Sequence, residues 1–222
     1  MIVGNTPRRW LPLVGAIVVL TLAACGDDTP AATTAVTAES TATTADGTGT
    51  ASTAAPRDAV LGDALDAVGT RYAFTATVTL DGAEVTMVEG TVYDGTGAYQ
   101  VATAGATVEY VASDEGQWAR QPGGEWTVLS EAAPLLDPLD PLSRPIDVRV
   151  LDSSGDDALL EATYDGATLG FAGGGRVDVS ITITGGAVAA ISYDVTVEGG
   201  TATVVTTFDG TADVSPIQVP PT

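Results

Sequence analysis

From Arg71 onward, apolar and polar residues alternate with a period of two, which is typical of β-strands that bury one face. The run from Arg71 to Leu80 is followed by Asp81-Gly82, a strong signal for a two-residue hairpin turn. The three clearest runs lie around residues 177–183, 191–197 and 202–208, and Gly185-Gly186 and Gly199-Gly200 separate them. Because strands joined by such short turns are antiparallel neighbours, the pattern predicts one large meandering antiparallel sheet.

Weaker alternation predicts more strands between these runs. One contains Val85, Met87 and Val92, and the others lie at about 97–103, 107–112, 116–120, 125–129, 146–151, 158–164 and 167–171. Before the first strand, the spacing instead predicts a short helix with one apolar stripe, formed by Leu61, Ala64, Leu65 and Val68.

Such a sheet has one apolar face that must be covered, and about ten strands offer more of it than one short helix can cover. The sheet either folds over as a sandwich or barrel, or curves around the helical pieces and leaves a gap. We expect a mainly β (α+β) fold, a large half-open barrel-like antiparallel sheet around one or two short helical segments. An incompletely filled apolar concavity would suit a lipid tail.

A leucine-rich segment interrupts the strands at residues 131–142. Prolines at 134, 138 and 141 disfavour one continuous helix there, although short helical turns remain compatible with the sequence. Such turns would line up four leucines on one side, namely Leu135, Leu136, Leu139 and Leu142. Two interpretations remain open: a lid over the concave face, or a capped corner of an ordinary core.

Composition then excludes several kinds of chemistry. The chain has 222 residues and no His, and all eight basic residues are Arg, so His-based triads, His-ligated metals and lysine chemistry are absent. A formal charge of −21 argues against binding to nucleic-acid phosphates. Carboxylate pairs such as Asp137 and Asp140, or Asp156 and Asp157, could act in glycoside hydrolysis, and residues 152–157 could bind Ca²⁺, but acids are frequent enough for chance clustering. We therefore expect a protein that is not an enzyme and has no cofactor or metal.

The N-terminal residues predict export and lipid attachment. Arg8 and Arg9 precede an apolar stretch at 11–24, which is too short for a membrane span of roughly 18–20 residues and fits a signal peptide. Leu22-Ala-Ala-Cys25-Gly resembles the bacterial lipobox, whose cysteine is diacylated and becomes the mature N-terminus. The alternative is an ordinary signal peptide with an incidental cysteine.

These signals predict three parts: a lipoprotein signal peptide at 1–24, the lipidated Cys25 with a tether up to residue 56, and a folded domain at 57–222. The tether is rich in Thr and Ala and lacks aromatic residues, so it cannot bury enough apolar area to fold. Two or more acyl chains on Cys25 would hold the domain at the outer face of the plasma membrane.

Several features follow one another along the chain: the lipobox, the tether, the short helix, the Tyr72-Ala-Phe-Thr run, Gly116-Gln-Trp-Ala, Glu125-Trp126-Thr, the Leu-Leu-Asp-Pro segment and the terminal Ile217-Gln-Val-Pro220. Their order resembles that of the LolA-like lipoprotein carriers, especially the actinobacterial LppX/LprG-type family. The resemblance implies a half-open antiparallel barrel around helices with an apolar cavity for acylated lipids. This chain departs from the family in having few aromatic residues and many Ala and Gly, which argues against a large cavity for several acyl chains.

Two functional hypotheses follow. The first is a lipid-binding or lipid-carrying lipoprotein that works with an envelope acceptor; the second is a cell-envelope interaction module with a closed β-sandwich and no small ligand. For the first, the expected cavity wall consists of Phe74, Val78, Val179, Ile181, Ile191, Val195 and Val204, with Leu135, Leu136 and Leu139 as the lid. Trp118 and Trp126 could form its rim; for all of these, packing in a closed core is the alternative.

Overall fold

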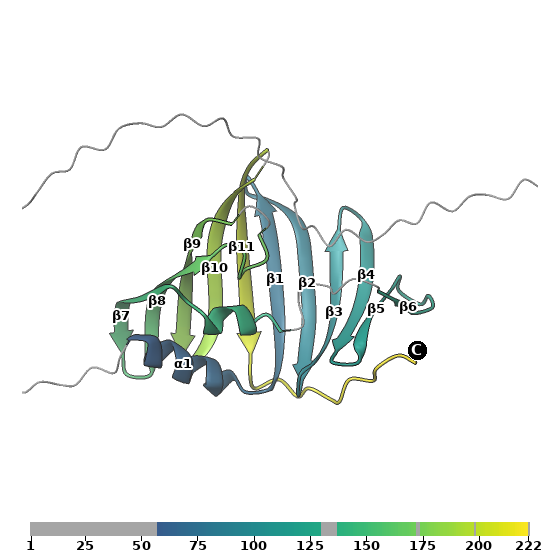
Figure 1. Ribbon diagram of the computed structural model, residues 1–222, viewed down its shortest axis with the longest axis horizontal. Coiled ribbons are helices and arrows are strands. Elements are labelled where there is room, and N and C mark those ends of the chain that lie inside the picture. Colours follow the sequence, from purple (N-terminus) through teal and green to yellow (C-terminus); the bar gives the residue numbers. More distant parts are fainter. Residues whose placement is uncertain (1–56, 130–136, 172–173, 198, 222) are drawn as a thin grey trace, which may run out of the picture.

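The computed structural model describes residues 57–129, 137–171, 174–197 and 199–221. Eleven strands form one antiparallel sheet in the order β6-β5-β4-β3-β2-β1-β11-β10-β9-β8-β7 (Figure 1). The strands are β1 (Arg71–Leu80), β2 (Ala83–Tyr93), β3 (Thr96–Thr103), β4 (Ala106–Ser113), β5 (Gly116–Arg120), β6 (Thr127–Val128), β7 (Asp147–Ser154), β8 (Asp157–Asp165), β9 (Arg176–Thr184), β10 (Ala187–Val197) and β11 (Gly200–Asp209). The helices are α1 (Arg57–Val68) and the 3-10 helix η1 (Asp140–Ser143).

The first and last strands of the chain pair at the centre of the sheet. The β1 and β11 strands run antiparallel with Phe74 opposite Phe208 and Val78 opposite Val204. This pairing joins two meanders, β1 to β6 and β7 to β11, into one sheet, and β6 and β7 form its two ends. The predicted mainly β fold with a large open antiparallel sheet is confirmed, and within the described residues the strands do not form a sandwich or a closed barrel.

The hairpin turns follow from residues that tolerate positive φ. Asp81 and Gly82 have φ of 48° and 83°, and Gly185 and Gly186 have 59° and 82°, as a two-residue turn with both central residues left-handed requires. The strand predicted at 167–171 is wrong. That stretch is a series of turns in the β8–β9 loop, closed by the Phe171 N–H, which donates to the Gly166 carbonyl at 2.8 Å.

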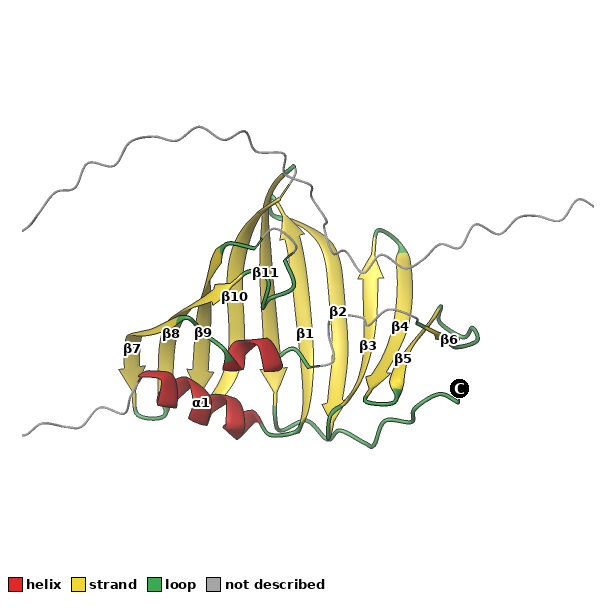
Figure 2. Ribbon diagram, viewed as in Figure 1, coloured by secondary structure: helices red, strands yellow, loops and turns green. Residues whose placement is uncertain are grey.

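One face of the sheet carries α1 and η1 in front of β7 to β11, as Figure 2 shows. We call it the apolar face, and the opposite one the polar face. The predicted stripe of α1 is confirmed: Leu61, Ala64 and Val68 are 2–3% exposed, and Leu65 packs against the same core. They join a core with buried side chains of β7 to β10, including Val148, Leu160, Tyr164, Val179 and Ile181.

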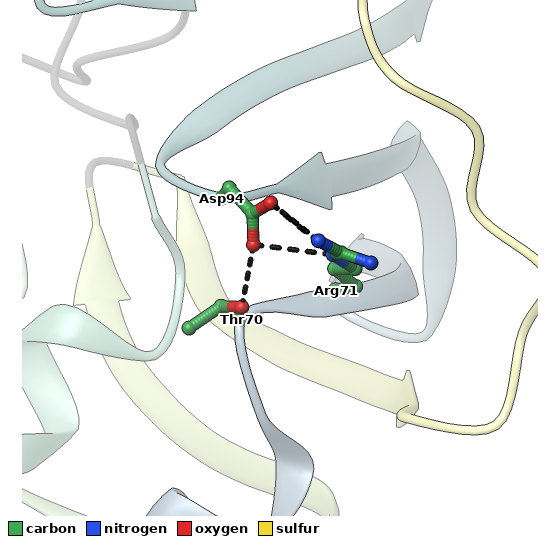
Figure 3. Close-up of polar contacts among 3 residues, drawn as sticks. All are labelled: Thr70, Arg71 and Asp94. Carbon is green, nitrogen blue, oxygen red and sulfur yellow. Dashed lines mark hydrogen bonds and ion pairs between the residues drawn. The ribbon is translucent and has the colours of Figure 1, made fainter.

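A polar cluster fixes the beginning of β1 against the end of β2. Asp94 accepts hydrogen bonds from the Thr70 hydroxyl at 2.8 Å and from Arg71 Nη2 at 2.7 Å (Figure 3). The Arg71 guanidinium also lies 4.4 Å from the centroid of the Tyr93 ring. The Arg71 guanidinium and the Thr70 hydroxyl lower the pKa of Asp94, so the carboxylate stays charged and keeps these contacts at neutral pH.

Gly90 leaves space for an aromatic ring in the middle of the sheet. It lies between Phe74 of β1 and Tyr99 of β3 in the strand register. A Cβ at this position would lie 2.6 Å from the Phe74 ring and 2.7 Å from the Tyr99 Cβ. The absence of a side chain therefore lets the Phe74 ring lie over the β2 backbone.

We predict that Gly90→Ala destabilises the fold by about 1–3 kcal/mol, because the methyl group overpacks against Phe74 and Tyr99. Gly62→Ala is the matched control. It sits in α1 with no atom within 4 Å of its Cβ position, and Ala stabilises a helix interior by about 0.5–1 kcal/mol relative to Gly. Urea unfolding of both variants measures the difference. Equal or inverted effects would contradict the close approach at Gly90.

Candidate functional site on the apolar face

One row of side chains crosses the apolar face, and its burial changes along the way. The register places Leu160, Ile181, Ile191, Thr206, Ala76, Val88, Val101 and Val108 in this order from β8 to β4. Leu160 and Ile181 are 0% exposed, beneath the helical elements. Val88, Val101 and Val108, at the other end, are only half-buried. The half of the sheet from β1 to β4 thus carries apolar side chains that are less covered than those of β8 and β9.

We call the half-buried part of this face the open apolar face. It consists of Phe74, Val78, Val88, Val101, Val108 and Val204. Val78 and Val204 are direct partners across β1 and β11. Phe74 packs against both hydrophobic clusters of the protein, so it links the open face to the core under α1.

The structure divides the residues predicted to line a cavity into two groups. Val179, Ile181, Ile191 and Leu139 are 0–8% exposed in the core beneath α1 and η1, and Val195 packs against its margin. Phe74, Val78 and Val204 lie on the open apolar face. Leu135 and Leu136, the rest of the predicted lid, lie outside the described residues, as does Cys25.

Two tyrosines fasten the segment that contains η1 to the sheet. The Tyr72 hydroxyl donates a short hydrogen bond to the Asp137 carboxylate, which also accepts the Leu139 N–H at 2.8 Å. The Tyr164 hydroxyl donates to the Leu142 carbonyl at 3.0 Å. Leu142 is 1% exposed. The described part of the leucine-rich segment is therefore a fixed part of the core.

A second aromatic cluster borders the open apolar face on β3 and β4. The rings of Tyr99 and Tyr110 stack with centroids 5.2 Å apart, next to Ala112. The Tyr99 hydroxyl is buried and has no hydrogen-bond partner within the described part of the chain. Burial raises the pKa of Tyr99 to about 12, so the hydroxyl stays protonated. It is a free donor at the margin of an apolar surface.

The tryptophans do not lie where a rim of this site was expected. Trp118 is opposite Val111 in the register, on the polar face, and is 1% exposed. Trp126 is half-buried and lies against the Arg120 guanidinium, 4.3 Å from the ring centroid. Trp118 lies one residue out of phase with Ala119, the partner of Tyr110, so only the strand register reveals its face.

Three of the carboxylates in the candidate pairs, those of Asp137, Asp140 and Asp157, make structural contacts. Asp137 is bonded to Tyr72, and Asp140 pairs with Arg144 at 2.6 Å. Asp157 accepts the Gly185 N–H at 2.8 Å, which ties the β7–β8 turn to the β9–β10 turn. Among the described residues, no three His, Cys, Asp or Glu side chains gather as metal ligands would. The open apolar face thus offers apolar side chains and, at its margin, the buried Tyr99 hydroxyl without a hydrogen-bond partner in the described residues.

Comparison with known proteins adds no family. No protein-family model matches the chain, and no curated protein matches it. Within the part of the chain that the structure describes, no helix is long and apolar enough to span a membrane.

We predict that Tyr72→Phe lowers the free energy of unfolding by about 1–3 kcal/mol, because the half-buried Asp137 carboxylate loses its hydroxyl donor. Hydrogen exchange at the Leu139 amide should accelerate as well. Tyr93→Phe is the control, because the Tyr93 hydroxyl makes no hydrogen bond within the described residues. Equal losses in the two variants would show that Tyr72 does not fasten the segment.

We also predict that stability falls as the pH rises above about 10. Burial raises the pKa of Tyr99 and Tyr193 to about 12 from the ordinary value of 10.0, so the unfolded chain loses these protons first. Each such group costs about 1.4 kcal/mol of stability per pH unit between its two pKa values. Unfolding measured from pH 8 to pH 11 tests this, and Tyr99→Phe should flatten the decline without loss at pH 8. An unchanged slope in that variant would contradict the assignment.

Proposed function

We propose that this chain is a membrane-anchored lipoprotein whose folded domain binds or carries a lipid or another acylated molecule on its open apolar face. No bond-making step belongs to this function. In this proposal the domain lies in the cell envelope, on the extracytoplasmic side of the plasma membrane. It uses no cofactor and binds no nucleic acid.

The observation that carries the proposal is the uneven covering of one row of mostly apolar side chains across the sheet. Ile181 is 0% exposed beneath the helical elements, whereas Val88 and Val101 in the same row are half-buried. Contiguous apolar patches on a domain surface can mark binding sites. An acyl chain laid along Val78 and Val204 would remove that surface from water.

The chemistry of the open apolar face suits an acyl chain with a small polar head. Valine and phenylalanine side chains line it, and the Tyr99 hydroxyl at its margin has no partner within the described residues. A buried donor without an acceptor is costly, and a carbonyl or hydroxyl oxygen of a lipid head would relieve that cost. The residues under α1 are already packed by the chain itself, so the proposed site is an open surface rather than the enclosed cavity expected from the sequence.

Transfer by such a site would be reversible. Moving a methylene group from a bilayer to this face exchanges one apolar environment for another, so the free-energy change is small. The direction of transfer would come from an acceptor in the envelope. The predicted lipidation of Cys25, which lies outside the described residues, would keep the domain near its lipid source, and the tether at 26–56 would let it reach the membrane surface.

We predict that the mature chain, residues 25–222 with Cys25→Ser, co-purifies with near-stoichiometric lipid. Val204→Gln should reduce the bound lipid about tenfold, since an unpaired amide against an acyl chain costs about 1–3 kcal/mol. Val205→Gln is the matched control, because Val205 is the next residue of β11, points to the polar face and is 40% exposed. Organic extraction with mass spectrometry, and a titration with the fluorescent acyl probe cis-parinaric acid, measure binding.

Three outcomes would contradict the proposal. One is an absence of extracted lipid together with no uptake of the probe. Another is equal loss of binding in Val204→Gln and Val205→Gln with unchanged circular dichroism. The third is a lipid-free domain that instead captures an envelope protein through its acidic surface, which would favour the interaction module.

A further inference from the structure

A trough crosses the polar face of β1 to β5, on the opposite side of the sheet from the open apolar face. It is a shallow depression, widely open to solvent, with a volume of about 570 Å³. Phe74, Gly90, Tyr99 and Tyr110 form one row across the four strands β1 to β4. Because side chains alternate along a strand and these point to the apolar face, their backbone forms the floor.

The two sides of the trough differ in chemistry. On one side the register aligns small or apolar residues, Ala73, Thr91, Ala98 and Val111. On the other side it aligns residues that donate or accept hydrogen bonds, Thr75, Glu89, Gln100 and Glu109. A ligand that fills the trough must therefore be apolar along one edge and rich in hydrogen-bonding groups along the other.

The end of the trough at β5 is built by a fixed network. Arg120 pairs with Glu109 at 2.5 Å, and the Gln100 amide donates to the same carboxylate at 3.4 Å. The Trp126 indole lies against the Arg120 guanidinium at 4.3 Å from the ring centroid. These contacts hold an aromatic ring and a paired carboxylate in place before any ligand arrives, which lowers the entropic cost of binding.

Three ligand classes fit this trough poorly. An acyl chain would desolvate the carboxylate of Glu89 without offering it a partner. An anion would meet Glu89, which has no ion-pair partner in the described residues, in a chain of net charge −21. A peptide strand could not extend the sheet, because the trough runs across central strands rather than along a free edge.

We propose that the trough binds a neutral oligosaccharide. A pyranose ring has a C–H face that packs on apolar and aromatic side chains such as Ala98 and Trp126. Its hydroxyl groups both donate and accept, so they can pair with the Glu89 carboxylate and with the Gln100 amide. The site is independent of the proposed lipid function, since it lies on the other face and uses none of the side chains of the open apolar face.

The test uses the full chain purified in a zwitterionic detergent, which carries no sugar headgroup. Isothermal titration calorimetry measures binding of maltotriose, cellotriose and triacetylchitotriose up to about 10 mM, and of a lysine-rich peptide as the alternative ligand. We expect at least one trisaccharide to bind. Trp126→Ala and Gln100→Ala should each weaken it about tenfold, and thermal unfolding of each variant verifies the fold.

Tyr93→Ala is the matched control. It removes the other arginine–aromatic contact, that of Arg71 with Tyr93, on the same face but outside the trough lining. Saccharide binding that persists in Tyr93→Ala and weakens in the two trough variants supports the proposal. The proposal is overturned if no trisaccharide binds, if the control weakens binding equally, or if only the peptide binds and loses affinity in Trp126→Ala.

Discussion

The structure depends on one constraint: a single antiparallel sheet of eleven strands has a long apolar face. In the described residues, α1, η1 and the β8–β9 loop with Leu169 and Phe171 pack on part of it. Burial of apolar area is the dominant stabilising contribution to folding, so α1 and η1 lie where the branched aliphatic side chains of β7 to β10 are most concentrated. The other half of the same face keeps half-buried valines. Packing and the proposed binding thus arise from the same surface.

Pairing of the first strand with the last gives the sheet its width. Because β1 and β11 meet at the centre, Phe74 and Phe208 are partners although they lie far apart in the chain. Phe74 then touches both hydrophobic clusters, and Gly90 provides the space its ring needs. Through this pairing of distant strands, Phe74 packs against both the covered core and the cluster beside the open apolar face.

The two proposed sites follow from the period of two along each strand. Side chains one residue apart point to opposite faces, so Val204 lies on the open apolar face while Val205 lies on the polar one. The proposed acyl-chain site and the proposed oligosaccharide site therefore lie on opposite faces of the same sheet. A molecule with a lipid part and a sugar part could not bridge the two faces without passing an edge, so we treat the sites as independent.

Much of the fold was predictable from the sequence, because alternation and two-residue turn signals are local. The apolar run of β1, the Asp81-Gly82 turn and the C-terminal hairpins all depend on the φ preferences and side-chain alternation of neighbouring residues. The apolar stripe of α1 was predictable as well, because the spacing of Leu61, Ala64 and Val68 is also a local pattern.

Other features depended on contacts between distant residues. Val179 and Val78 both lie in alternating apolar runs of the sequence. The helical elements cover the region of Val179, which is fully buried, whereas Val78 is half-buried. Likewise, neither the Tyr72 bond to Asp137 nor the Trp126 contact with Arg120 has a local signal. Alternation assigns a residue to a face, but which part of that face is covered depends on where the helical elements pack, and only the tertiary structure decides that.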